Sequence, residues 1–217
     1  FIGYGANLNT LDVPFLEIGQ QKILLEESGK QLSARPVDGK FVGTLVITPA
    51  CLGEILSTIV GNFMSDSVII DKTSPWIEKL GERVADERFT LSTIPLDDRI
   101  VCGERFTGEG YPSQNETLIE NGILKSFKLS AYGSRKTGYA RALNSSWNME
   151  VQPGDTSLEE ILSGIDKGLI LNRFSGGQPG TNGDFSGVAK NSFLIENGKM
   201  TDAVSETMVS GNLADIL

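Results

Sequence analysis

The chain has 217 residues, of which 39% are hydrophobic, and its 28 acidic and 19 basic residues give a net charge of −9. This composition is typical of a globular protein, and a chain of this length buries roughly 70% of its unfolded surface, enough for one large domain. The negative charge disfavours binding to nucleic acid and to anionic membranes, because the field of the protein repels their phosphates.

The chain contains no histidine and only two cysteines, Cys51 and Cys102. It therefore lacks the commonest zinc ligand and the usual general base, and Ser-His-Asp or Cys-His arrangements are excluded within it. Two distant cysteines indicate reduced thiols in the cytoplasm rather than a disulfide framework. No apolar run is long enough to span a membrane. The chain starts at Phe1 without a Met, so we expect a piece of a longer protein and leave upstream targeting signals open.

The N-terminal third predicts a helix over Phe15–Ser33, a turn at Val37–Lys40 and a strand over Phe41–Ile47. The clearest helix follows over Thr48–Met64, where Thr48 can cap and a proline occupies the first position. Its apolar residues repeat every three or four positions and form one stripe, made of Leu52, Ile55, Leu56, Ile59, Val60 and Phe63. Cys51 lies on the first turn, where it could be an activated thiol or a buried structural one.

The middle of the chain predicts a short helix from Ser74 to Gly81 and a strand over Phe89–Ile94. The sequence Leu-Ile-Glu-Asn-Gly occurs twice, at Leu118–Gly122 and Leu194–Gly198, between strand-like flanks. Asn-Gly adopts positive φ at low cost, so both sites predict tight hairpins with primed turns. The repeat indicates either two hairpins that use the same turn or an internal duplication, and the unmatched flanking residues favour the former.

A last helix is predicted after Pro153-Gly154. Either Thr156 with Glu159 or Ser157 with Glu160 can form its capping box, and Gly168 is its expected C-terminal glycine. A strand over Gly168–Phe174 and a glycine-rich loop over Ser175–Gly183 follow. The loop has neither the lysine of a P-loop nor the setting of a Rossmann fingerprint, so a turn or a flexible rim is its plain interpretation.

Carboxylates are the remaining candidates for acid-base chemistry or hard cations. Adjacent acids after a proline, Asp97 and Asp98, usually form a solvated turn, and Glu104 and Glu109 lie in similar loops. Asp184, in Gly183-Asp184-Phe185-Ser186-Gly187, could be a catalytic carboxylate, but an Asp between glycines more often fixes a turn. We list Asp184, Phe185 and Ser186 as a peptide-cleft or structural loop.

One basic stretch is interleaved with aromatic residues, a pattern that can hold single-stranded nucleic acid. The same residues could be solvated strand faces in an acidic chain, which is the interpretation that the net charge favours. The stretch consists of Lys125, Phe127, Lys128, Tyr132, Arg135, Lys136, Tyr139 and Arg141.

Several short motifs follow one another in a fixed order over roughly residues 40–213. They are Ser74–Val84, Gly108–Pro112, Leu118–Gly122, Thr137–Arg141, Asn148–Gly154, Gly183–Gly187, Ile195–Lys199 and Ser210–Asn212. In residues and order they resemble the C-terminal half of the TldD/PmbA family, zinc-dependent bacterial proteases together with their metal-free partner subunits. Tyr139 departs from the family's Thr-Gly-Asn-Ala-Arg. The resemblance treats residues 1–217 as a single C-terminal domain, without the family's N-terminal α/β half.

The resemblance implies an α+β fold with mostly antiparallel strands, a curved or barrel-like sheet and three or four helices. It also implies a heterodimer in which a TldD-like homologue carries zinc and a PmbA-like (TldE) subunit shapes the chamber. Such pairs act in proteolysis and peptide maturation on unfolded peptides, including microcin precursors and antitoxins. A homodimer is the alternative where that homologue is absent, and older naming calls PmbA a modulator of DNA gyrase.

The metal-site positions of the family are substituted here. Catalytic members carry His-Glu-x-x-x-His where this chain has Ser57, Thr58 and Asn62, and a Cys where it has Leu213. The resemblance therefore implies a vestigial site with no catalytic residue, no metal ligand and no cofactor, zinc being expected only on the partner. Without the resemblance, Ser57 and Asn62 would be ordinary polar residues on the wet face of a helix.

Two classes of function follow from these observations. The first is the metal-free subunit of a TldD/PmbA-type metalloprotease complex, inactive alone. The alternative is an autonomous carboxylate-dependent hydrolase, or a binding module for nucleic acid or gyrase that uses the basic stretch. If the first holds, Leu213 lies near Ser57 and Asn62. Because those two are five positions apart, about 140° around an ideal helix, we expect an irregular helix end near Gly61.

Overall fold

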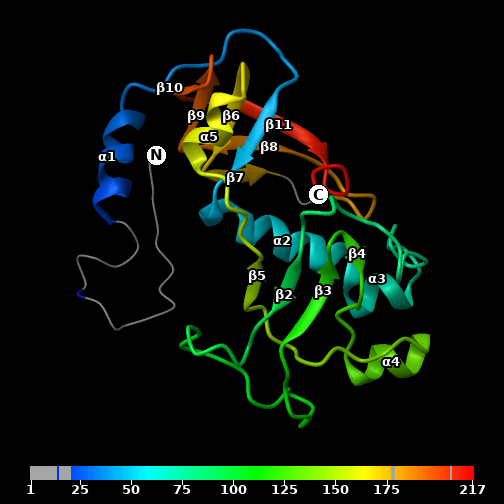
Figure 1. Ribbon diagram of the computed structural model, residues 1–217. Coiled ribbons are helices and arrows are strands. Elements are labelled where there is room, and N and C mark those ends of the chain that lie inside the picture. Colours follow the sequence, from blue (N-terminus) through cyan, green and yellow to red (C-terminus); the bar gives the residue numbers. More distant parts are fainter. Residues whose placement is uncertain (1–13, 15–20, 177–178, 206) are drawn as a thin grey trace. The chain divides into compact units, whose positions relative to one another are not determined.

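The computed structural model describes residues 14, 21–176, 179–205 and 207–217. Figure 1 shows the order of its elements. The helices are α1 (Gln21–Gln31), α2 (Pro49–Met64), α3 (Asp66–Ile70), α4 (Ala131–Thr137) and α5 (Leu158–Ser163). The strands are β1 (Thr44–Ile47), β2 (Leu91–Thr93), β3 (Glu116–Glu120), β4 (Ile123–Leu124), β5 (Met149–Val151), β6 (Lys167–Leu171), β7 (Arg173–Gly176), β8 (Asp184–Lys190), β9 (Ser192–Glu196), β10 (Lys199–Val204) and β11 (Thr207–Asn212). The predicted α+β class with mostly antiparallel strands is confirmed, and these strands are divided among three sheets.

The chain divides into two compact units. Unit 1 combines residues 1–54, 155–177 and 186–210, and unit 2 combines residues 55–154, 178–185 and 211–217. That the whole chain folds as one domain stays a prediction. Within the described residues, no helix has both the length and the apolar content needed to cross a membrane.

A four-stranded sheet in the order β1-β6-β9-β10 forms the centre of unit 1. β1 runs parallel to β6, whereas β6, β9 and β10 pair antiparallel. Ile170, Phe193, Ile195 and Ala203 of these strands form a buried cluster with Ile165. Because side chains alternate between the two faces of a strand, these residues place the core of unit 1 against one face of the sheet.

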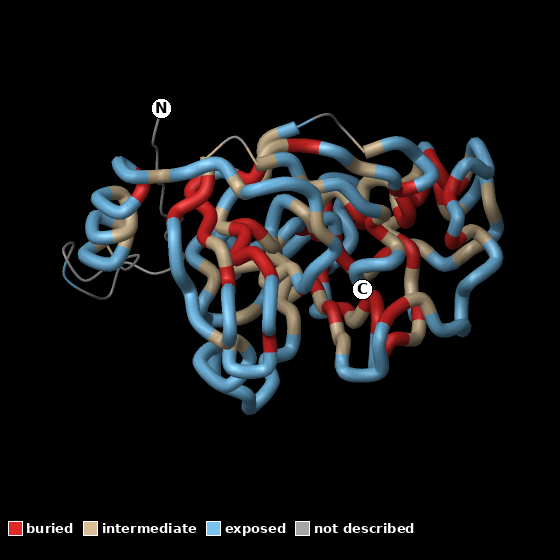
Figure 2. The backbone as a smooth tube through the Cα atoms, turned by 90° about the horizontal axis from the view of Figure 1, so that it is seen from above, coloured by how far each residue is buried: buried red, intermediate tan, exposed pale blue. Residues whose placement is uncertain are grey.

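The helices of unit 1 are only partly as predicted. Ser157 and Glu160 form the capping box of α5, with both reciprocal bonds present at 3.2 and 2.9 Å. The helix ends at Gly164, so the prediction of Gly168 was wrong; Gly168 lies in β6, where the carbonyl oxygen of Thr44 leaves no room for a side chain. Figure 2 shows α1 almost entirely in the exposed and intermediate colours. The first six residues of the helix predicted from Phe15 lie outside the described residues.

The single strand predicted over Gly168–Phe174 is two strands, and that prediction was wrong. β6 pairs with β1 and β9, whereas β7 pairs with β8 in a three-stranded sheet of order β11-β8-β7. The chain changes sheets at Asn172, whose side chain donates to the carbonyl of Asn191 at 2.9 Å. The two halves of the segment pair with strands of different sheets, so the strand is interrupted here. The apolar pattern of the segment gives no indication of this interruption.

Unit 2 contains an antiparallel sheet in the order β4-β3-β2-β5. The predicted stripe of α2 supplies its helical core, because Leu56, Ile59, Val60 and Phe63 are at most 3% exposed. Phe63 also packs on Trp76, with 4.9 Å between ring centroids. The amphipathic pattern thus predicted both this helix and its buried face.

Both Asn-Gly hairpins are confirmed. Asn121 and Gly122 have φ of 48° and 78°, and Asn197 and Gly198 have φ of 51° and 78°. Positive φ at both central residues defines the type I′ turn, whose twist matches that of the flanking strands. These turns connect β3 to β4 and β9 to β10.

Two segments of unit 2 differ from prediction. The short helix expected from Ser74 to Gly81 is a series of turns, so that prediction was wrong. The Ser74 hydroxyl donates to the Phe63 carbonyl at 2.6 Å and accepts from the amide of Trp76 at 3.0 Å. The helix α4 was not predicted. It begins at the cap Ser130 and ends at Gly138 with φ of 81°.

Candidate functional site

The predicted metal-site positions of α2 lie beside its buried stripe. Ser57, Thr58 and Asn62 are half-buried, rather than on a fully wet helix face. The Asn62 side chain donates to the carbonyl of Pro179 at 3.2 Å. α2 runs without interruption to Met64, so the expectation of an irregular end near Gly61 was wrong. Nothing lies within 4 Å of a side chain built at Gly61, so no close contact forces a distortion there.

Leu213, the fourth position, follows directly after β11. Its side chain is 3% exposed and its amide donates to the carbonyl of Gly183 at 2.8 Å. The preceding Asn212 donates to the carbonyl of Asn182 and to the carboxylate of Asp184, both at 2.9 Å. The C-terminal position is therefore fixed by both backbone and side-chain bonds.

A single loop, residues 179–184, connects the two parts of the predicted site. Pro179 bonds Asn62 of α2, and Gly183 bonds Leu213, although about 150 residues separate these two positions in the sequence. Gly183 has a φ of 88°, and a side chain there would lie 2.9 Å from both the Phe63 ring and the Asn212 side-chain oxygen. The loop is thus in close contact with α2 on one side and with the residue before Leu213 on the other. How far Leu213 lies from Ser57 stays a prediction.

Comparison with known proteins gives the family of this chain. Residues 39–217 match the PmbA/TldA metallopeptidase C-terminal domain. The chain belongs to the PmbA/TldD metallopeptidase family. It is 32% identical over 203 residues to a metalloprotease of Methanocaldococcus jannaschii. The aligned region covers 86% of this chain and 44% of that protein. It is 26% identical over 176 residues to the metalloprotease PmbA of Escherichia coli O157:H7, covering 78% of this chain and 37% of that one.

Solved structures give the same family. TldE from Thermococcus kodakarensis superposes with a TM-score of 0.78 at 26% identity, covering 93% of this chain and 49% of that one. A candidate modulator of DNA gyrase from Bacteroides thetaiotaomicron superposes with a TM-score of 0.81 at 30% identity, covering 94% and 46%. The chain therefore spans about half the length of the relatives it matches.

This PmbA/TldD domain does not offer a zinc site at the four positions. Zinc is bound by thiolate, imidazole or carboxylate, whereas Ser57 and Thr58 offer hydroxyls, Asn62 an amide and Leu213 no donor. Among residues 14, 21–176, 179–205 and 207–217, no group of three His, Cys, Asp or Glu could hold a metal ion. The donor set present does not fit the metal that the family implies.

The loop that contains Asp184 is held by its own polar groups. The Asp184 carboxylate accepts from the side chains of Asn182 at 2.7 Å and Asn212 at 2.9 Å, so both of its oxygens are engaged. Phe185 lies beside Gly211, where an added side chain would come within 3.2 Å of its ring. Ser186, the next residue of β8, is exposed. These contacts support the structural interpretation of Asp184. No local pattern predicted the roles of Asn182 and Asn212, because their partners belong to distant segments.

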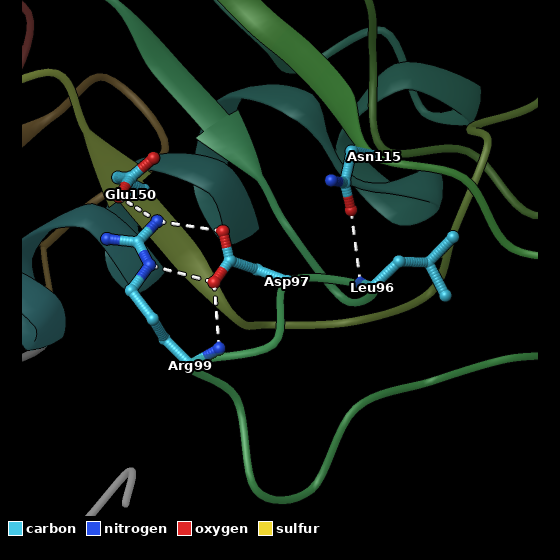
Figure 3. Close-up of polar contacts among 5 residues, drawn as sticks. All are labelled: Leu96, Asp97, Arg99, Asn115 and Glu150. Atoms are coloured by element: carbon cyan, nitrogen blue, oxygen red, sulfur yellow. Dashed lines mark hydrogen bonds and ion pairs between the residues drawn. The ribbon is translucent and has the colours of Figure 1, made fainter.

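Three of the four other candidate carboxylates are also engaged. Asp97 forms an ion pair with Arg99 (Figure 3), whose hydrogen bonds lower the pKa of Asp97 to about 2. Burial would raise the pKa of Glu104, but bonds from Ser113 and Ser145 outweigh it and lower that pKa. Glu109 accepts the first amide of α4 at 2.9 Å. Asp97, Glu104 and Glu109 each have a structural partner, which argues against acid-base chemistry at these three residues, whereas the Asp98 side chain has no ion pair or hydrogen bond among the described residues.

The basic stretch is only partly exposed. Phe127 is 2% exposed, and Tyr139 contacts its ring edge-on at 5.0 Å while donating to the carbonyl of Ile77 at 2.9 Å. Arg141 lies 4.0 Å from the Tyr111 ring. The expectation of strand faces was wrong for residues 131–137, which form α4. Since Phe127 is buried and Tyr139 is half-buried, Tyr132 is the one well-exposed ring of the three, and this stretch provides no row of aromatic platforms for bases.

Cys51 is buried, as its structural interpretation expected, and Lys128 is half-buried, which was not predicted. Burial raises the pKa of the Cys51 thiol to about 11, which agrees with a structural cysteine rather than a nucleophile. The Lys128 ammonium donates to the carbonyl and side-chain oxygens of Asn144 at 2.8 and 2.6 Å. Burial lowers the pKa of Lys128 to about 8, and the nearby carboxylates of Glu116 and Glu104 partly offset this effect.

The lowered pKa of Lys128 leads us to expect that the stability of the fold depends on pH. Its pKa is lower in the folded state, about 8 against 10.5, so between these values the unfolded chain binds more protons and stability rises with pH. The quantity to compare is the free energy of unfolding of the wild type minus that of Lys128→Met. We expect this difference to rise by about 1–2 kcal/mol between pH 8 and pH 10.5, a range that allows for solvent screening. Urea denaturation measures it. Lys125→Met, at an exposed lysine, is the control. If the difference in unfolding free energy between wild type and variant is independent of pH for both variants, the prediction is contradicted.

Proposed function

We propose that this chain is part of a metal-free, noncatalytic subunit of the PmbA (TldE) type. It acts with a zinc-bearing TldD-like homologue in proteolysis and maturation of peptides. The observation that carries the proposal is the donor set at Ser57, Thr58, Asn62 and Leu213, which cannot bind zinc. A threonine hydroxyl also cannot serve as the general base at neutral pH.

The geometry of α2 supports this proposal. In a regular helix, positions 57 and 62 point about 140° apart and do not face one metal. The loop 179–184 nevertheless binds Asn62 and Leu213, so a frame around the substituted positions is kept. A loop that still holds these positions although they carry no zinc ligand is consistent with a subunit that shapes the peptide chamber, while the zinc-bearing partner performs the hydrolysis. The free thiols of Cys51 and Cys102 support a reducing, cytoplasmic setting.

The first expected result is the absence of a stoichiometric zinc site. The chain has no histidine and has leucine at position 213, and within the described residues no three His, Cys, Asp or Glu side chains lie together as zinc ligands. Protein refolded with added zinc and then desalted should contain far less than one zinc per chain by elemental analysis. One tightly held zinc per chain, with peptide hydrolysis that a chelator abolishes, would falsify the proposal.

The second test concerns the partner. The full-length protein should co-purify with a zinc-bearing homologue from the same genome when both are expressed together. Peptide hydrolysis should appear in the complex and be lost when the homologue's zinc ligands are substituted. Size-exclusion chromatography with light scattering gives the stoichiometry. A protein that stays monomeric, or forms only homodimers, beside every such homologue would refute the pairing.

A further inference from the structure

The strand β1 forms one edge of the four-stranded sheet in unit 1. Among the described residues it pairs with β6 alone, in parallel and without a register shift. The amide of Thr48 donates to the carbonyl of Leu171 at 3.1 Å. Because the amides and carbonyls of successive residues along a strand point alternately to its two sides, Val46 bonds towards β6, whereas Leu45 and Ile47 direct their backbone groups outward.

These outward backbone groups have no hydrogen-bond partner within the part of the chain that the structure describes. The side chains of Leu45, Val46 and Ile47 are only half-buried, and Val42, just before the strand, is fully exposed. A row of unpaired amides and carbonyls at a sheet edge is a template for a further strand. The edge of β1 thus combines free backbone groups with accessible apolar side chains.

The opposite edge of the same sheet, β10, is protected in ways that β1 is not. β10 has a register shift between Met200 and Ala203. Arg35 also pairs alongside it, because its amide donates to the carbonyl of Ala203 and its carbonyl accepts from the amide of Ser205, both at 2.9 Å. Bulges, charges, prolines and covering segments are the usual means of blocking an edge strand. The sequence of β1, Thr-Leu-Val-Ile, contains no charge and no proline, and its pairing has no bulge.

We propose that β1 is a self-association edge, which pairs antiparallel with β1 of a second copy about a two-fold axis at Val46. A strand paired antiparallel with itself is self-complementary under two-fold symmetry, and this strand has no charge to face its own copy. In this register the outward groups of Leu45 bond those of Ile47 in the other copy, and the reverse, so every outward group of both strands is paired.

The register is limited at the other end by Pro49, which begins α2 and has no amide hydrogen to donate. An axis at Val46 also places apolar, mostly β-branched side chains opposite one another across the two strands, the kind of cross-strand pair that stabilises a sheet. The inference goes beyond the proposed function, because it concerns contact between identical chains and uses none of the four substituted positions.

A cysteine on the proposed axis tests both the partner and the register. Val46 and its copy would be a non-hydrogen-bonded pair, whose Cα atoms lie about 4.5 Å apart, within the range of a disulfide. The exposed native thiol is first removed by Cys102→Ser. In that background, with the full-length protein in a glutathione buffer and no homologue present, Val46→Cys should form a disulfide-linked dimer at least about tenfold faster than Thr44→Cys. Thr44 is the matched control, because it lies on the same strand face and is more exposed, yet is roughly 14 Å from its own copy at about 3.4 Å per residue.

Light scattering on the protein without added cysteines gives a second measurement. A concentration-dependent dimer should appear, and added salt should strengthen it, because salt screens the repulsion between two chains of charge −9. Leu45→Pro should abolish the dimer, since it removes an outward donor but no bond to β6. Circular dichroism checks that each variant is folded.

Three outcomes would overturn the proposal. Equal cross-linking of Val46→Cys and Thr44→Cys would mean that the chains meet by random collision. A protein that stays monomeric up to about 1 mM would have no self-association edge. Cross-linking of Val46→Cys that occurs only after a homologue is added would assign the edge to that homologue instead of a second copy.

Discussion

Replacing Gly183 by alanine should lower the free energy of unfolding by about 3 kcal/mol. Two costs combine at this residue. A non-glycine residue at its φ of 88° is strained by roughly 1–2 kcal/mol. The new methyl group would also lie 2.9 Å from the Phe63 ring, which is fully buried against Trp76 and cannot move aside. Overpacking of this kind costs about 1–3 kcal/mol.

A matched control separates the two costs. Gly81 has nearly the same φ, 86°, but no atom lies within 4 Å of a side chain built there. Gly81→Ala should therefore show the strain alone, about 1 kcal/mol. Urea denaturation of both variants measures the difference, provided that their m-values agree. Equal losses would mean that the loop 179–184 does not contact α2 as described, and the frame around the substituted positions would lose its main support.

Replacing Glu116 by leucine should be more damaging, at about 3–5 kcal/mol. Glu116 is 9% exposed, and its carboxylate accepts from the Ser126 hydroxyl at 2.7 Å and the Leu143 amide at 2.9 Å. It also offsets the charge of Lys128. Leucine would leave two donors and a partly buried ammonium without their partner, which is the costly way to break such a pair.

The same strand provides the control. Glu120 lies four residues further along β3 and forms an exposed ion pair with Lys125 at 3.2 Å. Glu120→Leu should change stability by less than about 1 kcal/mol. In the double variant with Lys128→Met, the loss should be at least about 1 kcal/mol smaller than the sum of the two single losses, because the uncompensated charge is removed. Additive losses would show that Glu116 acts through its hydrogen bonds and not through Lys128.

The candidate site was predictable only in part. The motif order indicated the family, which the match over residues 39–217 confirms, and placed attention on Ser57, Thr58, Asn62 and Leu213. The loop 179–184 appeared only as a glycine-rich turn. Its contacts with Asn62 and Leu213 join segments far apart in sequence, and local patterns carry no information about such pairs.

The sequence by itself determined those elements whose cause is local. The buried stripe of α2, the two Asn-Gly turns and the capping box at Ser157 depend on residues within a few positions of one another. Only the tertiary structure decided the elements whose partners are distant. The Ser74 hydroxyl bonds the carbonyl of Phe63 where the segment forms turns, and Gly133 of α4 lies where a side chain would meet the carboxylate of Asp66. Asn172 divides an apolar run because its halves pair in different sheets. In each case a contact made across the fold outweighs a local preference of about 1 kcal/mol or less.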